Sequence, residues 1–123
     1  MIEWKATEDY AFPAADDHIV HGGMVATLLD TAMGQSTWTL LDRGEVFLTA
    51  DLHTDFYRPA RPGLLRAEGR VVHKTRRTAF AVADLFDDAR ALLDAGAPLL
   101  SRARNHRRPG ARRPRWRGAS SRR

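Results

Sequence analysis

The sequence predicts an α+β fold in which one long helix covers one face of an antiparallel sheet. A proline-free run from Gly23 places apolar residues at three- and four-residue spacing, which is typical of a helix. Four strand-like segments joined by short turns follow it, and strands joined in this way pair antiparallel. A single helix buries its apolar side against such a sheet, so we expect the two to pack together.

Before the helix, short apolar groups around Trp4, Tyr10 and Phe12 predict one strand. The helix is predicted to end at Arg43–Gly44, because glycine commonly follows the last turn of a helix. The residues that form its apolar face are Val25, Leu28, Leu29, Ala32 and Ser36.

The four strands that follow are predicted at residues 46–57, 64–73, 78–86 and 91–100. Residues of the first strand alternate, with Val46, Leu48, Ala50, Leu52 and Phe56 on one side and Phe47, Thr49, Asp51, His53 and Asp55 on the other. This period of two is that of a half-buried strand. Proline, glycine and paired aspartates mark the turns between strands, while Gly96 and Pro98 weaken the last strand.

Charge divides the chain into an acidic domain, residues 1–100, and a basic tail, residues 101–123. The domain holds all 15 acidic residues and ten of the 20 basic ones, whereas the other ten, all arginine, lie in the tail. The tail has one large apolar residue, Trp116, so it cannot bury enough surface to offset its conformational entropy. We expect one folded domain and a disordered tail that binds nucleic acid only non-specifically.

Several function classes are excluded by composition. The chain has no cysteine, so disulfides, zinc thiolates and thiol catalysis are ruled out. No apolar run approaches the ~20 residues that span a bilayer, and no signal segment is visible, so a cytoplasmic protein without membrane contact is expected. The histidines His18, His21, His53 and His73 lack metal-ligand spacing, and no metal site is predicted.

The segment His21-Gly-Gly-Met-Val-Ala-Thr-Leu-Leu-Asp30 is the candidate for chemistry. Glycines at a helix start let a ligand approach the backbone and leave amide N–H groups free for a carbonyl oxygen that gains negative charge. Asp30 lies about two helical turns after Gly23. Its neighbours on the same face, Ala26 and Gly34, are small, so we expect a groove beside the carboxylate.

Plainer interpretations exist for each of these residues. An Asp on an amphipathic helix is often a solvated polar side chain, and a Gly-Gly pair is often a turn. His21 is either an acid–base group or a residue whose hydrogen bond fixes the turn before the helix; we favour the second.

The segment HGGMVATLLDTAMG, with an Asp nine residues after the His, resembles hotdog-fold acyl-CoA thioesterases of the phenylacetate-degradation type. The similarity continues through residues 49–52, 57–60 and 71–88. It implies a long central helix wrapped by an antiparallel sheet, paired into a homodimer that is often doubled into a homotetramer. It also implies hydrolysis of acyl-CoA at the dimer interface with no separate cofactor, because coenzyme A is part of the substrate.

The resemblance also implies a role for each matching residue. Gly22 would offer its N–H to the thioester oxygen, the partner's Asp30 would act as general base or nucleophile, and Thr49 would help to hold the water. The residues expected to contact substrate are His21, Gly23, Phe56, Tyr57, Arg58, Pro59, Arg61, Lys74, Arg76 and Arg77. The basic residues among them suit phosphates, although ordinary solvated turns are the alternative.

Two departures from the pattern leave other functions open. Many relatives carry an Asn six residues before the histidine as a second oxyanion donor, and a Gly three residues after that Asn; here Ala15 and His18 stand there. The end of the last strand is replaced by arginine-rich sequence, which we interpret as a shifted reading frame. The alternatives are therefore a non-catalytic hotdog protein that binds acyl-CoA, or a nucleic-acid binder acting through its tail.

Overall fold

The computed structural model describes residues 1–89 and 91–104. Its elements are β1 (Ile2–Ala6), a 3-10 turn (Glu8–Tyr10), β2 (Ala11–Ala14), β3 (Asp17–Val20), α1 (Gly22–Trp38), β4 (Glu45–Phe56), β5 (Gly63–Lys74), β6 (Thr78–Phe86) and β7 (Leu92–Arg104). Five strands form one antiparallel sheet in the order β1-β5-β6-β7-β4. The predicted α+β class is confirmed.

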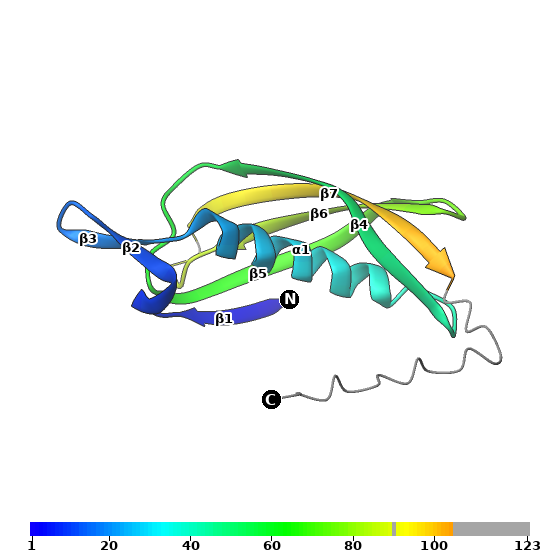
Figure 1. The fold of residues 1–123 in the computed structure, drawn as a ribbon, viewed down its shortest axis with the longest axis horizontal. Coiled ribbons are helices and arrows are strands. Elements are labelled where there is room, and N and C mark those ends of the chain that lie inside the picture. The colour runs from blue at the N-terminus through cyan, green and yellow to red at the C-terminus, as the bar shows by residue number, and fades with distance from the viewer. Residues whose placement is uncertain (90, 105–123) are drawn as a thin grey trace, which may run out of the picture.

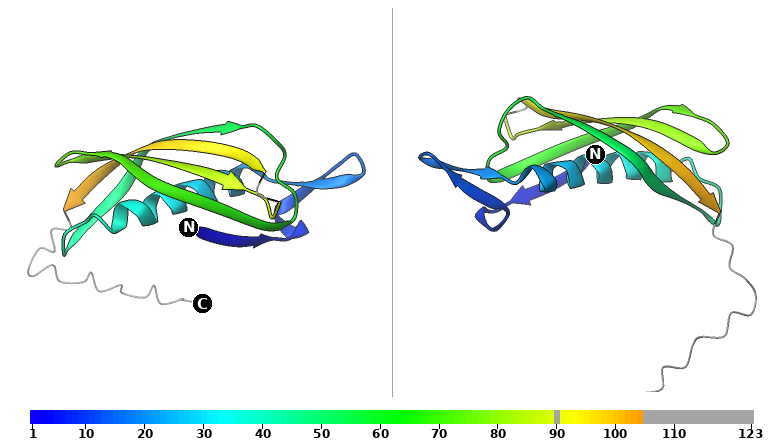
Figure 2. Two further views of the ribbon diagram at one scale, coloured as in Figure 1. Left: turned by 180° about the vertical axis from the view of Figure 1, so that it is seen from behind. Right: turned by 45° about the horizontal axis from the view of Figure 1, so that its top comes forward.

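The sheet curls around α1, which lies along its concave side (Figure 1), and the reverse view shows the sheet covering the helix (Figure 2). Strands β2 and β3 form a separate two-stranded hairpin that projects beyond the sheet at the end where α1 begins. Strand β4 is an edge strand, because only β7 pairs with it among the described residues.

The core lies between α1 and the middle strands of the sheet. Leu29 and Met33 of the helix and Leu65 and Leu85 of the sheet are at most 1% exposed. Most other core residues of β5 and β6 are alanines: Ala67, Ala79, Ala81 and Ala83. These small side chains allow the helix to lie close to the strands.

The backbones of helix and sheet approach each other closely at Gly69 on β5. A Cβ atom at this position would lie 2.3 Å from the carbonyl oxygen of Ala32 and 2.8 Å from the amide nitrogen of Met33. Both atoms belong to the backbone of α1, which cannot move aside as a side chain can. A glycine is therefore required where the helix crosses β5.

We expect Gly69→Ala to lower the free energy of unfolding by about 3 kcal/mol, since the added methyl group must displace the helix backbone. Urea denaturation of both proteins measures the difference. Gly96→Ala is the matched control, because a Cβ there meets its nearest neighbours at an ordinary 3.4 Å. Equal losses in the two variants would contradict a specific contact at Gly69.

A β-bulge between Thr49 and Asp51 divides β4 into two halves. Before the bulge, Phe47 contacts the helix and Thr49 bonds to it; after the bulge, Leu52 packs on the core and Phe56 reaches the start of the helix. Odd positions thus face the helix in the first half and even positions in the second. The single alternation predicted for this strand is wrong, because the bulge shifts its phase by one residue.

Three predicted boundaries also change. The helix ends at Trp38 rather than at Arg43–Gly44, and Gly44, with φ of 84°, serves the turn before β4 instead. The region before the helix forms a hairpin in addition to the one predicted strand. Strand β7 continues to Arg104, four residues beyond the predicted domain boundary, because its backbone pairs with the start of β4. The rest of the predicted tail lies outside the described residues.

Candidate active site

Asp30 is held by a hydrogen bond from the edge strand. The Thr49 hydroxyl donates to Asp30 Oδ1 at 2.9 Å. Asp30 itself is half-buried, whereas its neighbour Leu29 points into the core and is fully buried. The carboxylate therefore lies at the boundary between α1 and β4, positioned by a strand residue and still reachable from solvent. The predicted role of Thr49 in holding a water stays a prediction.

The predicted groove is open on only one side of Asp30. A Cβ atom at Gly34 would lie 3.0 Å from the ring of Phe47, so this aromatic side chain already fills the space that Gly34 leaves. Gly34 is buried, whereas Ala26 is partly exposed. The open side therefore extends from Asp30 toward the start of the helix, and the prediction of space next to Gly34 is wrong.

His21 fixes the start of the helix. Its ring nitrogen Nδ1 accepts a hydrogen bond of 3.0 Å from the Gly23 N–H. The backbone N–H of His21 donates to the carbonyl of Tyr10. Nδ1 therefore serves as an N-cap, which satisfies one of the unpaired amides of the first turn. This geometry supports the structural interpretation of His21.

The Gly22 N–H is the amide that the cap leaves available. Gly22 is the first residue of α1, where an N–H has no acceptor within the helix, and it forms no hydrogen bond with another described residue. The ring of Phe56 lies over it, 3.4 Å from where a Cβ would be. The positive end of the helix dipole points in the same direction, so an anionic oxygen would be stabilised here.

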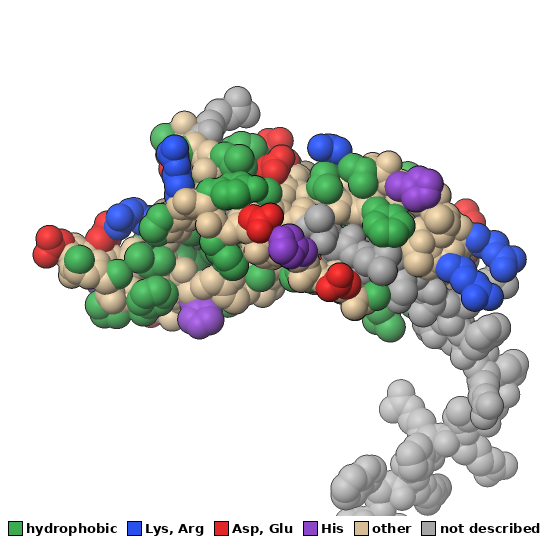
Figure 3. Space-filling view, turned by 90° about the horizontal axis from the view of Figure 1, so that it is seen from above, with side chains coloured by type: hydrophobic (Ala, Val, Ile, Leu, Met, Phe, Trp, Pro, Cys, Tyr) green, Lys and Arg blue, Asp and Glu red, His purple; other side chains and the backbone are tan. Residues whose placement is uncertain are grey.

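A cavity of about 310 Å³ opens beside Gly22. Its walls come from the end of β4 and the following loop, from α1, and from the hairpin, which contributes Phe12 and Ile19. The space-filling view from above shows hydrophobic side chains gathered at this hairpin end of the molecule (Figure 3). The sequence did not identify Phe12 and Ile19 as site residues, since no motif marks them; only the pairing of β2 with β3 brings them to Gly22.

Asp30 and Gly22 are too far apart in one chain to act on the same carbonyl group. They are eight residues apart on one helix, which corresponds to about 12 Å along its axis. An amide that stabilises the oxygen of a thioester must lie about 3 Å from that oxygen. A thioester whose carbon is attacked at Asp30 would have its oxygen too far from the Gly22 amide, which lies about 12 Å away along the helix. One protomer therefore holds both halves of the predicted site but does not join them.

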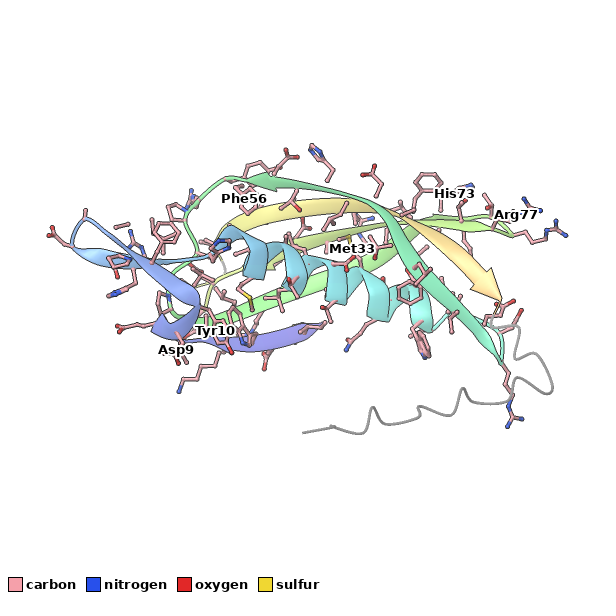
Figure 4. The ribbon with its side chains drawn as sticks, in the orientation of Figure 1. Asp9, Tyr10, Met33, Phe56, His73 and Arg77 are labelled. Atoms are coloured by element: carbon pink, nitrogen blue, oxygen red, sulfur yellow. The ribbon has the colours of Figure 1, made fainter. Side chains whose placement is uncertain are left out.

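The basic residues predicted to contact coenzyme A fall into two groups. Arg58, Pro59 and Arg61 line a second cavity of about 430 Å³ near the start of β5, and Arg58 and Pro59 also border the cavity at Gly22. The turn that holds Lys74, Arg76 and Arg77 lies at the opposite end of the molecule, as the positions of Phe56 and Arg77 show (Figure 4). A single protomer does not bring the two groups together.

Lys74 and Arg61 have partners within the protomer. The Lys74 ammonium donates to the carbonyl of Leu40, which follows the end of α1, and Arg61 forms an ion pair with Asp17 of the hairpin. Both therefore support the fold of their own chain in addition to any role in binding.

The position where relatives carry an Asn lies away from Gly22. Ala15 occupies the turn of the hairpin with φ of 53°, a left-handed conformation that is costly for alanine. The ladder from Ala11↔Val20 to Ala14↔Asp17 separates this turn from the helix start by about 10 Å of strand. An Asn side chain at position 15 would not reach Gly22 of the same chain.

The ion pair between Asp17 and Arg61 ties the hairpin to the loop before β5. The pKa of Asp17 is lowered from 3.8, chiefly by the hydrogen bond from the His18 N–H and further by the Arg61 charge. A lowered pKa means that the folded chain favours the charged carboxylate of Asp17, which stabilises the fold. This stabilisation is fully present above pH 3.8, the ordinary pKa of the group, and is lost as the pH falls through the lower pKa that Asp17 has in the folded chain.

We expect NMR titration to show Asp17 ionising below its ordinary range, and Arg61→Ala to move the midpoint upward. The shift should be partial, because the His18 amide still donates to the carboxylate. Arg70→Ala serves as the control, because Arg70 lies on β5 and forms no ion pair with Asp17. An unchanged midpoint in Arg61→Ala would exclude a contribution of the arginine.

A helix along the concave side of a curled antiparallel sheet is the arrangement of the hotdog fold. The family model described as the thioesterase superfamily matches residues 17–93. The chain belongs to the thioesterase superfamily. No protein with a curated description matches it significantly.

Similar solved structures agree with this assignment. A Bacillus halodurans protein crystallised with CoA is 27% identical, with a TM-score of 0.77 over 82% of this chain and 69% of that one. A putative thioesterase from Ralstonia eutropha JMP134, described as phenylacetic acid degradation-related, is 27% identical, with a TM-score of 0.74 over 80% and 72%. The resemblance to hotdog thioesterases that the sequence predicts is confirmed. Among the described residues, no helix has the length and apolarity to cross a membrane.

Proposed function

We propose that the protein hydrolyses acyl-CoA thioesters as a homodimer, with Asp30 as general base or nucleophile and Gly22 as oxyanion donor. The observation that carries this proposal is the hydrogen bond from Thr49 to Asp30, on the same helix whose first amide, the Gly22 N–H, has no acceptor among the described residues. Membership of the thioesterase superfamily supports hydrolysis of a thioester.

The chemistry follows from these two groups. In the general-base route, Asp30 accepts a proton from water as the water oxygen bonds to the thioester carbon. The carbonyl oxygen becomes negative and is stabilised by the Gly22 N–H. The C–S bond then breaks, and the thiolate of coenzyme A takes up the proton. In the nucleophilic route, the Asp30 carboxylate attacks the carbon, and the C–S bond breaks to form a mixed anhydride and the thiolate of coenzyme A. Water then hydrolyses the anhydride to the acyl carboxylate and the Asp30 carboxylate, and the thiolate takes up a proton released in this step.

A second copy would bring the two groups together. Strand β4 has a free edge among the described residues, and a free edge is a template for pairing with another strand. In a two-fold pair the strands run antiparallel, so the helices beside them do too. Asp30 of one protomer then approaches Gly22 of the partner, across the open side of its groove. Association of two such dimers into a tetramer is also consistent with this proposal.

The same pairing would unite the two basic groups. The turn at Lys74–Thr78 lies at the opposite end of the protomer from Phe56–Arg61, and antiparallel pairing places each turn near the partner's loop. Arginines from both chains could then bind the phosphates of one coenzyme A. One of the similar solved structures, that of the Bacillus halodurans protein, was determined with CoA.

The proposal is tested by incubating the full chain with a panel of acyl-CoA thioesters and measuring release of the free thiol. Turnover that scales with the concentration of dimer supports the enzyme. The second candidate, a non-catalytic acyl-CoA-binding protein, is favoured by the separation of Asp30 and Gly22 by about 12 Å along the helix of one protomer. Saturable binding of acyl-CoA without thiol release would establish that alternative.

We expect Thr49→Val to lower kcat about tenfold, because the hydroxyl that positions the Asp30 carboxylate is lost while the shape of the side chain is kept. Thr49→Ser retains the hydroxyl and should restore most of the rate. KM should change little in both variants, since neither removes a contact to coenzyme A. A tenfold loss in the serine variant as well would attribute the effect to packing rather than to the hydrogen bond.

A further inference from the structure

Strand β4 carries three titratable side chains on the face that points away from the helix. After the bulge its even positions face the helix, so Asp51, His53 and Asp55 project from the convex face of the sheet. The Nε2 atom of His53 lies 3.0 Å from Oδ1 of Asp55, and their side chains are 70% and 55% exposed. Asp51 is exposed as well. These three residues form a triplet on a strand whose outer edge no described strand covers.

The proposed dimer fixes where the two-fold axis crosses β4. Asp30 meets the partner's Gly22, and Gly22 the partner's Asp30, only if the axis passes midway between the two residues. On β4, Thr49 bonds to Asp30, and the ring of Phe56 lies over Gly22. The middle of the stretch between Thr49 and Phe56 is Leu52–His53. The axis therefore crosses the strand at the triplet.

Symmetry restricts the register of the two strands. Neighbouring pairs in an antiparallel ladder alternate between hydrogen-bonded and non-hydrogen-bonded types, whereas pairs related by a two-fold axis must be of the same type. One residue must therefore lie opposite its own copy, and near the axis this residue is Leu52 or His53. With Leu52 on the axis, each Asp51 faces the partner's His53. With His53 on the axis, the two imidazoles face each other and each Asp51 faces the partner's Asp55.

Either register brings two copies of the triplet together across the axis. Residues directly opposite in an antiparallel pair have Cβ atoms about 5 Å apart, and like charges in such pairs are destabilising. Four carboxylates then meet two imidazoles, so the net charge is −4 when both imidazoles are neutral and −2 when both are protonated. Protonation of His53 therefore relieves the repulsion in both registers.

Neighbouring strands of the sheet do not offset this repulsion, and α1 packs on the other face. On β7, the residues that pair with the triplet are Leu99, Ala97 and Ala95. Beyond them, Asp84 of β6 and Arg70 of β5 project from the same face, about 10 Å and 14 Å away across the sheet. Salt screens charges at these distances, and the two residues act in opposite directions. The charge of the imidazole therefore decides how strongly the two triplets repel each other.

We propose that the Asp51, His53 and Asp55 side chains of two copies meet at the two-fold axis and make the strength of the dimer depend on pH. This inference rests on the proposed function, because the shared site places the axis. A histidine ordinarily titrates near pH 6.5. The dimer binds the imidazole proton more tightly than the free protomer does, so the added affinity is present below this range and is lost as the pH rises through it.

Sedimentation equilibrium of the full chain measures the dissociation constant of the dimer between pH 5.5 and pH 8. We expect a constant about tenfold lower at pH 5.5, because two exposed imidazoles each gain a modest attraction to the partner's carboxylates. His53→Gln keeps a polar side chain but does not titrate, so its constant should not change over this range. His73→Gln is the matched control, since His73 is exposed on β5 beside Phe80, and it should retain the pH dependence. An undiminished pH dependence in His53→Gln would overturn the inference.

Crosslinking tests the position of the axis independently. The chain has no cysteine, so a single introduced cysteine can react only with its own copy. A short bis-thiosulfonate reagent should link the protomers of Leu52→Cys or His53→Cys, but not those of Asp84→Cys, whose copies lie about 24 Å apart across the joined sheets. A dimer that is linked at neither position 52 nor position 53 would also overturn the inference. Neither measurement follows hydrolysis, so this failure is distinct from that of the proposed function, which would be absence of thiol release from acyl-CoA.

Discussion

Asp30→Asn will lower kcat for thioester hydrolysis by ~10²–10⁴-fold, because an amide can neither accept a proton from water nor attack a carbonyl carbon. The variant should fold normally. Asn has the shape of Asp, and its side-chain oxygen can still accept the hydrogen bond from Thr49. Rates of thiol release at saturating substrate measure the loss, and the thermal unfolding midpoint checks the fold.

A carboxylate outside the site provides the control for this substitution. Glu68 is exposed on β5, and Glu68→Gln changes the net charge by the same amount as Asp30→Asn. We expect its rate to equal that of the unmodified chain. If Asp30→Asn retained full activity, the carboxylate would have no part in the reaction and the assignment of the site would be wrong.

Gly22→Pro will lower kcat by ~10²–10³-fold, because proline has no N–H to donate to the oxyanion. The helix should tolerate this change. Gly22 is the first residue of α1, where proline is favoured, and the preceding His21 has ψ of 130°, in the extended range that a following proline requires. Gly22→Ala retains the N–H and meets the Phe56 ring at an ordinary 3.4 Å, so most of the rate should remain.

Mixing the two inactive variants distinguishes a shared site from a site within one chain. In a heterodimer of Asp30→Asn and Gly22→Pro, one of the two interfacial sites has both an intact Asp30 and an intact Gly22. Random assortment should therefore restore about a quarter of the original activity. Co-expression with two affinity tags yields the heterodimer for assay. An inactive mixture that contains verified heterodimers would contradict the shared site.

The elements of this fold were predictable where a regular pattern extends over many residues. The apolar spacing of Val25, Leu29 and Ala32 indicates α1, and the interval from His21 to Asp30 indicates the candidate site, because both patterns are local in the chain. The bulge in β4 was not predictable. The alternation of residue types continues unbroken through Ala50, whereas the change of face results from pairing with β7.

Contacts between distant segments account for the other differences. Phe47 fills the space beside Gly34, and Phe12 reaches the cavity at Gly22; each joins residues on different elements. The interval from His21 matches Ala15 to the expected Asn position, but the interval does not show that a hairpin carries this residue away from the helix. The pattern of residue types identified the chemical groups, and the tertiary contacts determine which of them meet.

The bulge in β4 imposes a parity rule on the evolution of this strand. Six residues separate Thr49 from Phe56, and both side chains face the helix only because the bulge takes up one of them. While the bulge is kept, inserting or deleting one residue elsewhere in this stretch would turn one of the two side chains away from the helix. Loss of the one residue at the bulge would instead leave a regular strand with both side chains on the same face. Related chains should therefore differ in length here by even numbers where the bulge is kept, and by one residue where it is lost.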